Sequence, residues 1–272
     1  MLLTLLLSAI RVIVIPAQYE DRSFEYGHSE LAAITSAAAS YFNSQYGENG
    51  KFSFELAPIV TLSHTLSYYG RDYSDRRDAL VGNAVSEACR LSDANVDFSS
   101  YDKLIVLSAG EDQSEGAEPD FIWPQTARLK DWHTIPLILD GKTIDLFSIV
   151  TELHLKDDGS TVLAGPGTLC HEFGHQLGLV DFYDTDQEAS GGLSPGLYCT
   201  SLMDYGYRNA VLPVFGAPDY ELLGIGKQEI LTPGTHKLSS IEKSHNYFKL
   251  PDRTEGEFYL VEFRSGIGLY IY

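Results

Sequence analysis

Basic residues are scarce in this chain of 272 residues. Lysine and arginine together number 19 against 38 aspartates and glutamates, which leaves a formal net charge of -19 at pH 7. A field of this sign repels phosphate backbones and anionic membrane surfaces, so we expect no nucleic-acid partner. The excess of carboxylates fits two interpretations, general solubility and clusters that hold calcium, of which solubility is the more common.

Cysteine and long apolar runs are also rare. Cys89, Cys170 and Cys199 are too few for a disulfide scaffold, and none has the paired spacing of a cysteine zinc site. A disulfide bond between Cys170 and Cys199 is one interpretation, although free buried thiols are more common. No run approaches the roughly 20 apolar residues that span a bilayer, so we expect no membrane span. Residues 1–10 are apolar but lack a basic start and a cleavage site, and they fit either a signal remnant or a first structural segment.

The order of apolar residues predicts a mixture of helices and strands in a chain that is 44% hydrophobic. β-Branched runs predict strands, apolar residues at helical spacing predict helices, and Asp140-Gly141 predicts a hairpin. The expected strands are 11–18, 51–62, 103–108 and several within 247–272; the expected helices are 30–46 with Ser29 as N-cap, 79–91 and a short one at 221–223; the hairpin joins 134–139 to 143–148.

One short segment carries the residues of a metal site. A Gly-Pro-Gly break at 165–167 precedes a helix that Thr168 is expected to cap and Gly178 to end. His171 and His175 are four residues apart on this helix, so their imidazoles project from one face and can bind one zinc ion. The alternative is a pair of hydrogen-bonded helix histidines without a metal.

Glu172 follows the first of these histidines and completes a His-Glu-x-x-His motif. Its carboxylate is placed beside the open position of a catalytic zinc, where it can take a proton from a zinc-bound water and pass it to the leaving amine. The motif therefore predicts peptide hydrolysis without a covalent intermediate.

Asp181 is the candidate for a third ligand, because a catalytic zinc takes three protein ligands and keeps one position open. Gly178 tolerates a positive φ and can turn the chain back toward the metal. The spacing matches the extended signature H-E-x-x-H-x-x-G-x-x-H with Asp in place of the last His. If Asp181 is not a ligand, another carboxylate or one of five remote histidines must replace it: His64, His133, His154, His236 or His245.

The segment Ser201-Leu202-Met203-Asp204-Tyr205 resembles the Met-turn of metzincin peptidases. In those enzymes the turn places a methionine beneath the zinc ligands as an apolar floor, and the resemblance implies this role for Met203. Tyr205 matches a tyrosine that in some of these enzymes stabilises the developing oxyanion. An ordinary core methionine and a tyrosine without a catalytic role are the alternatives.

Most of the chain resembles the M6 family of metallopeptidases, the immune inhibitor A type. The similar segments are 41–47 (Tyr-Phe-Asn-Ser-Gln-Tyr-Gly), 96–102 (Val-Asp-Phe-Ser-Ser-Tyr-Asp), 122–124 (Ile-Trp-Pro), 170–184 and 258–264 (Phe-Tyr-Leu-Val-Glu-Phe-Arg). The resemblance implies an α+β, zincin or metzincin-like catalytic domain with a twisted mixed sheet, backing helices, an active-site helix and a Met-turn. It also implies a secreted or cell-surface bacterial location and, commonly, bound calcium.

The chain departs from that family at one calcium loop. Family members often carry an Asp-Gly-Asp-Gly loop after a Tyr-Asp pair, whereas here Tyr101-Asp102 runs directly into Lys103. A second acidic cluster follows the zinc motif, and it fits calcium ligands and solvated surface about equally well. Its members are Asp184, Asp186 and Glu188.

The main prediction is a zinc-dependent endopeptidase that acts on polypeptide substrates, and the resemblance implies calcium as a second ion. We expect one catalytic unit made of two subdomains, residues 1–178 with the sheet and active-site helix and residues 179–272 with the Met-turn and closing strands. Two alternatives remain: a zinc exopeptidase, and a catalytically silent binding module with the same fold.

Overall fold

The computed structural model describes residues 9–133, 135–186, 189, 191–194 and 196–272. The chain divides into two compact units. The first contains the residues up to Asn43 together with Asn49–Gln176, and the second contains Ser44–Glu48 together with Leu177–Tyr272. The subdomain boundary predicted at residue 178 stays a prediction.

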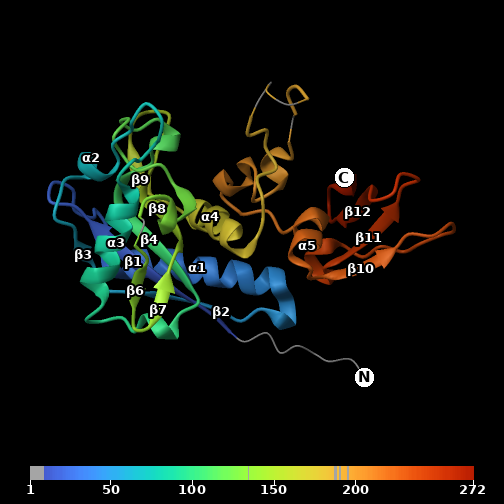
Figure 1. Cartoon of the computed structure of the whole chain (residues 1–272). Helices are drawn as coiled ribbons and strands as arrows, with labels where there is room; N and C mark the ends of the chain where they lie inside the picture. The colour runs from blue at the N-terminus through green and yellow to red at the C-terminus, as the bar shows by residue number, and fades with distance from the viewer. Residues whose placement is uncertain (1–8, 134, 187–188, 190, 195) are drawn as a thin grey trace. The chain divides into compact units, whose positions relative to one another are not determined.

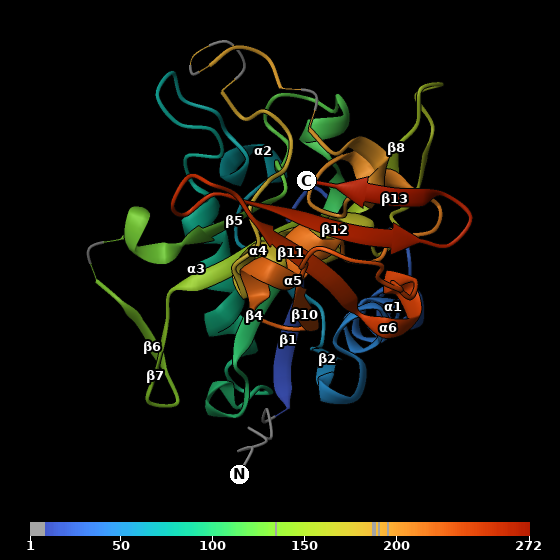
Figure 2. The same cartoon turned by 90° about the vertical axis from the view of Figure 1, so that its right-hand side faces the viewer.

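The first unit is built on a seven-stranded mixed sheet with the order β2-β1-β4-β8-β5, in which β3 also pairs with β1 and β9 with β8. Strands β1, β2, β3, β4 and β8 are parallel neighbours, and β5 and β9 run antiparallel to β8. Figure 2 labels β5, which stands at the end of the order. The strands are β1 (Ile10–Gln18), β2 (Phe52–Leu56), β3 (Val60–Thr61), β4 (Lys103–Glu111), β5 (Gln125–Arg128), β8 (Leu146–Leu155) and β9 (Thr161–Leu163).

Helices of the first unit pack against this sheet, as Figure 1 shows. Successive strand residues point to opposite faces. Phe147 and Ile149 of β8 join one core cluster with the buried side of α3, so Ser148 between them points to the other face, where α4 lies. The helices are α1 (His28–Tyr46), α2 (Leu66–Tyr69), α3 (Val81–Ser92) and α4 (Gly167–Leu177).

An aromatic cluster holds α4 in the first unit. Phe173 is fully buried, and its ring lies 4.9 Å from those of Phe42 on α1 and Phe54 on β2. Both contacts are edge to face, the arrangement that aromatic quadrupoles favour. The helix is therefore anchored by the residue that directly follows the predicted base, two positions before the second predicted histidine.

The second unit contains a four-stranded sheet with the order β10-β11-β12-β13. Its strands are β10 (Lys227–Ile230), β11 (Asn246–Pro251), β12 (Phe258–Arg264) and β13 (Gly268–Ile271), and its helices are α5 (Ala217–Leu223) and α6 (Ile241–Ser244).

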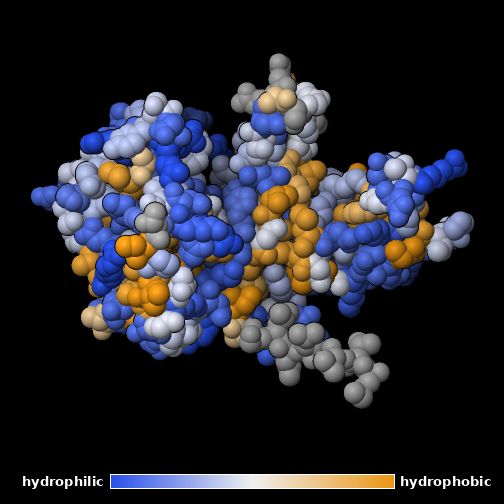
Figure 3. All heavy atoms as spheres, viewed as in Figure 1, coloured by the Kyte–Doolittle hydropathy of each residue, from blue (hydrophilic) through white to orange (hydrophobic). Residues whose placement is uncertain are grey.

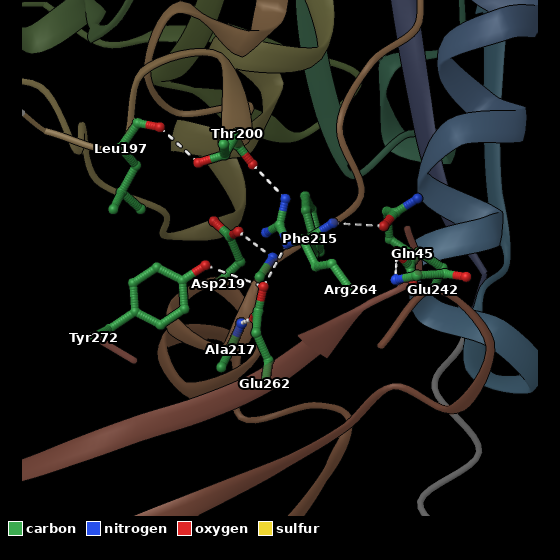
Figure 4. A network of polar contacts seen from close by, with 12 residues as sticks. Gln45, Leu197, Thr200, Phe215, Ala217, Asp219, Glu242, Glu262, Arg264 and Tyr272 are labelled. Atoms are coloured by element: carbon green, nitrogen blue, oxygen red, sulfur yellow. Dashed lines mark hydrogen bonds and ion pairs between the residues drawn. The ribbon is translucent and has the colours of Figure 1, made fainter. Parts of the chain in front are cut away.

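A buried ion pair organises this unit, and Figure 4 shows its surroundings. Arg264 donates to Glu262 over 2.5 Å and to the carbonyl of Thr200 over 2.7 Å. Glu262 also accepts from the amide of Ala217 and from the Tyr272 hydroxyl. Because both members of the pair have further hydrogen-bond partners, the cost of burying the charges is offset. The network joins β12 to the segment that precedes Met203.

Hydrophilic residues cover much of the first unit in the view of Figure 3, with apolar residues in separate patches. Among the described residues, no helix is both long and apolar enough to cross a bilayer. A small hairpin is formed by β6 (Leu137–Leu139) and β7 (Lys142–Ile144), and short 3₁₀ helices occupy Gly47–Asn49, Phe98–Ser100, Gln113–Glu115, Leu129–Asp131, Tyr198–Thr200 and Tyr205–Arg208.

The mixture of helices and strands expected from the sequence is present, with several corrections. Residues 51–62 form two strands rather than one, and residues 146–148 begin β8 rather than end the hairpin. Neither Ser29 nor Thr168 is an N-cap, because both lie inside their helices. At the start of α1, the Glu30 carboxylate instead accepts from the amide of Gly27. All three cysteines are free thiols.

Candidate metal centre

Helix α4 places the two predicted histidine ligands on one side. His171 is buried and His175 is half-buried, and their rings meet edge to face with centroids 4.9 Å apart. The helix ends at Leu177, and Gly178 follows with φ +109°, a backbone conformation that favours glycine. Asp181 lies three residues beyond this turn.

One ligand atom from each of His171, His175 and Asp181 lies within 4.8 Å of the other two. Among the described residues these three form the only group of at least three histidine, cysteine or acidic side chains with this geometry. Zinc binds imidazole nitrogen and carboxylate oxygen at about 2.0 to 2.2 Å, so atoms this close can share one ion after small rotations. Two imidazoles and one carboxylate also form a donor set that catalytic zinc sites use.

Glu172, the predicted base, is buried, with 7% of its surface exposed. Its Oε2 atom accepts a hydrogen bond of 2.9 Å from the hydroxyl of Thr126 on β5. Its main-chain carbonyl also accepts hydroxyl hydrogen bonds, from Thr126 at 2.7 Å and from Ser148 at 3.2 Å. The proposed proton carrier is thus held by the two last strands of the sheet order.

The Ser-Leu-Met-Asp-Tyr segment is folded around Asp204 in the second unit. This buried carboxylate accepts hydrogen bonds of 2.7 Å from the amides of Leu197, Tyr198 and Tyr205. A carboxylate with three amide donors is well satisfied in a buried position. Tyr198 has a positive φ of 51°, and the hydrogen bond from its amide to Asp204 helps to hold this backbone conformation.

The other two predicted residues of this segment differ in exposure. Met203 is fully buried, and its carbonyl accepts from the amide of Phe182, the residue after Asp181. Tyr205 is 47% exposed, and its ring lies 5.9 Å from that of Tyr198 and 6.4 Å from that of Tyr183. A role for either side chain in catalysis remains a prediction.

The predicted calcium cluster has no third described carboxylate. Asp184 accepts from the amides of Asp186 and Ser194, as acidic residues do in turns. Glu188 lies outside the described residues. Calcium binding therefore stays a prediction without structural support.

Sequence reasoning missed four polar residues around α4 and the Met203 segment: Thr126, Ser148, Gln176 and Asp204. The signal for Asp204 was present, because an acidic residue between Met203 and Tyr205 is ideally placed to accept amides in a turn. Thr126 and Ser148 carry no local signal, since polar residues in strands are usual on solvent-facing positions.

A comparison with family models matches residues 99–209 to the immune inhibitor A peptidase M6, catalytic domain. No curated protein matches the chain. The matched segment contains all three residues of the ligand group, the acidic residue between the two histidines and the Ser-Leu-Met-Asp-Tyr segment. A peptidase domain implies polypeptide substrates, and a metallopeptidase implies a metal. The match over residues 99–209, which contain the group of His171, His175 and Asp181, supports an M6 family metallopeptidase of the immune inhibitor A type.

Proposed function

We propose that this chain is a zinc-dependent endopeptidase. The observation that carries the proposal is the gathering of His171, His175 and Asp181 ligand atoms within 4.8 Å, next to Glu172 in the same helix. Two nitrogens and one oxygen favour zinc over calcium or magnesium, which prefer oxygen ligands alone.

The chemistry follows from the roles of these side chains. The three ligands hold the ion, which when bound supplies Lewis-acid activation of water and of the peptide carbonyl. The Glu172 carboxylate accepts a proton from the attacking water and returns it to the leaving amine. Its burial at 7% exposure excludes bulk water, which strengthens its interactions with the reacting groups.

Strand β5 offers a surface for an extended substrate. It stands at the end of the sheet order, and Thr126 in its centre contacts Glu172. A polypeptide that adds to this edge as a further strand would pass the base and expose internal peptide bonds to it. This arrangement favours internal cleavage over trimming from an end.

Two further residues receive supporting roles in this proposal. Met203 forms an apolar floor for the ligand set, an assignment supported by its complete burial and by its hydrogen bond to the residue after Asp181. Tyr205 donates a hydrogen bond from its phenolic hydroxyl to the developing oxyanion. Its 47% exposure supports this assignment, because the side chain is accessible to a substrate. Export to the outside of a bacterial cell and calcium binding are carried over from the family resemblance alone.

The test is metal analysis of the purified chain combined with casein cleavage. We expect one zinc per chain, loss of cleavage with a chelator, and recovery when zinc is added back. Glu172→Gln should keep the zinc and lower kcat by about a hundredfold to ten thousandfold, because it removes the proton carrier and not a ligand. Full cleavage by this variant, or wild-type protein that cleaves without any metal, contradicts the proposal.

The same experiment separates the two alternative functions. An exopeptidase would release single residues or dipeptides from denatured casein, whereas an endopeptidase gives internal fragments whose sizes mass spectrometry resolves. A silent binding module would hold zinc and cleave nothing. The presence of Glu172 in hydrogen-bonded contact with the sheet argues against the silent module, since a module that only binds needs no base there.

A further inference from the structure

Four polar side chains form a cluster where α4 meets the sheet; three of them are buried and that of Thr126 is half-buried. Thr126 on β5 and Ser148 on β8 lie directly opposite each other in the antiparallel pair, and their hydroxyl oxygens are 2.7 Å apart. Glu172 and Gln176, one turn apart on α4, face this pair. All four residues belong to the first unit.

Gln176 determines how the cluster shares its protons. Its amide nitrogen donates to the Leu104 carbonyl at 2.7 Å and to the Ser148 hydroxyl at 2.8 Å. An amide has two protons to donate, so both are used. Ser148 therefore accepts from Gln176 and has its own single proton left, which the Glu172 carbonyl at 3.2 Å or Thr126 at 2.7 Å can take.

The single proton of Thr126 has two acceptors on Glu172, the side-chain carboxylate and the main-chain carbonyl. The hydroxyl of Thr126 lies 2.9 Å from Oε2 of Glu172, which is within the range of an O–H···O hydrogen bond. A carboxylate that is ready to accept a proton is ionised and has none of its own. A proton on this line therefore comes from Thr126. When Thr126 donates to Oε2, the Ser148 hydroxyl is left to donate to the Glu172 carbonyl at 3.2 Å.

We propose that Thr126 is a positioning residue for the Glu172 carboxylate, acting through the hydrogen bond to Oε2. This inference rests on the proposed function, in which Glu172 carries the proton. The hydroxyl holds one oxygen of the base from the rigid edge of the sheet and fixes the rotation of the carboxyl group. Preorganised contacts of this kind increase the rate because the base need not be ordered during the reaction.

A purely structural interpretation is that Thr126 only ties α4 to the sheet. The hydroxyl also lies 2.7 Å from the Glu172 carbonyl, a main-chain contact that Ser148 makes as well. The two interpretations differ in what Ser148 should do, because Ser148 contacts the helix main chain and not the carboxylate. Removing each hydroxyl in turn therefore distinguishes positioning of the Glu172 carboxylate from anchoring of α4 to the sheet.

The experiment compares Thr126→Val, Thr126→Ser and Ser148→Ala with wild type, with kcat, KM, zinc content and melting temperature measured for each. Thr126→Val keeps the shape and removes the hydroxyl, and it should lower kcat about ten- to a hundredfold, as expected for loss of a hydrogen bond to a charged group. KM should change by less than about twofold, and the zinc should be retained. Thr126→Ser should keep kcat within about threefold of wild type, because it keeps the donor.

Ser148→Ala should lower the melting temperature but change kcat far less than Thr126→Val does. Equal losses of kcat in these two variants, or a loss in Thr126→Ser as large as in Thr126→Val, would overturn the inference in favour of helix anchoring or packing. Loss of zinc from Thr126→Val would overturn it as well. If Thr126→Val does not fold, Thr126→Ala against Thr126→Ser gives the same comparison.

Failure of this inference differs from failure of the proposed function. If Glu172→Gln cleaves like wild type, the proposed function fails and the positioning role falls with it. If Glu172→Gln is inactive while Thr126→Val keeps full kcat, only the role of Thr126 is wrong.

Discussion

The amide of Phe182 donates a hydrogen bond of 2.8 Å to the carbonyl of Met203. Phe182 directly follows Asp181, the proposed third ligand, so this bond ties the segment after α4 to the segment that resembles the Met-turn. The contact joins residues 21 positions apart through main-chain atoms alone, and it does not depend on the methionine side chain. Substitution of the Met203 side chain therefore tests the packing of that side chain and leaves the main-chain hydrogen bond available.

Met203→Ala should weaken zinc retention as well as stability. The side chain is fully buried, and its removal leaves a cavity that typically costs about 2 to 5 kcal/mol. Leu202→Ala is the matched control, because Leu202 is equally buried and adjacent. Zinc release into a chelator should be faster in Met203→Ala than in Leu202→Ala at a similar loss of stability. Equal release rates would reduce Met203 to an ordinary core residue.

Asp181→Ala should lower zinc affinity by more than the ten- to hundredfold that is usual when an outer-shell partner is lost. Asp181→His should recover much of this loss, because imidazole nitrogen is also a good zinc ligand. Competition with a chromophoric chelator measures both affinities, and Asp157→Ala, at an exposed carboxylate, is the control. Wild-type zinc affinity in Asp181→Ala would show that another residue is the third ligand.

Gly178→Ala should weaken the metal site through the backbone. A positive φ of this size costs an alanine roughly 1 to 2 kcal/mol, so the turn that leads to Asp181 should shift. Gly116→Ala is a close match, since Gly116 has φ +98°, and for both glycines no described atom beyond the chain neighbours lies within 4 Å of a Cβ. We expect similar losses of melting temperature in the two variants and a loss of zinc affinity in Gly178→Ala alone. Unchanged zinc affinity in Gly178→Ala would mean that the ligand geometry does not depend on this turn.

Asp204→Asn should disturb the segment that carries Tyr205. The amide side chain has one acceptor oxygen where the carboxylate has two, so at least one of the three amides that Asp204 binds loses its partner. An unsatisfied buried donor costs about 1 to 3 kcal/mol. Asp158→Asn, in an exposed turn at Ser160, is the control. Denaturant unfolding should show a free energy of unfolding that is about 1 to 3 kcal/mol lower in Asp204→Asn and less than about 0.5 kcal/mol lower in the control. Equal stability of the two variants would contradict the role of the three hydrogen bonds to Asp204.

Asp78 should make the stability of the first unit fall as pH rises. Burial raises the pKa of this carboxyl from 3.8 to about 8, and the nearby Asp72 adds to the shift. Between these two pKa values the folded chain binds the proton and the unfolded chain does not, so this contribution is fully present below pH 4 and lost as pH rises toward 8. The slope for one proton is about 1.4 kcal/mol per pH unit.

Asp78→Asn cannot ionise and should remove that slope. Both tryptophans, Trp123 and Trp132, lie in the first unit, so the tryptophan fluorescence of urea unfolding at pH 5, 6 and 7 reports on it. The free energy of unfolding should fall less steeply with pH in Asp78→Asn than in wild type. The difference in slope should be about 1.4 kcal/mol per pH unit, the value for one proton. Asp157→Asn should keep the wild-type slope. An unchanged slope in Asp78→Asn would show that the carboxyl is ionised in the folded chain.

Local patterns in the sequence were sufficient to predict that the side chains of His171, His175 and Asp181 come together. His171, His175 and Asp181 lie within eleven residues, and one helix with one glycine turn is enough to bring them together. The helix over 28–46 and the strands over 10–18 and 103–111 were also predicted closely, because long runs with clear periodicity or β-branched composition have strong signals. Strand β5 was missed, since Gln-Thr-Ala-Arg has neither signal.

The sequence by itself therefore determined which side chains meet at the proposed metal site, because their positions are set by covalent spacing along one helix and the turn after it. Only the tertiary structure decided what holds the base, because Thr126 reaches Glu172 across 46 residues and Gln176 reaches Leu104 across 72. Those contacts depend on strand order and register, which arise from pairing between distant segments. A local pattern of residues does not predict which distant strands pair or in what register.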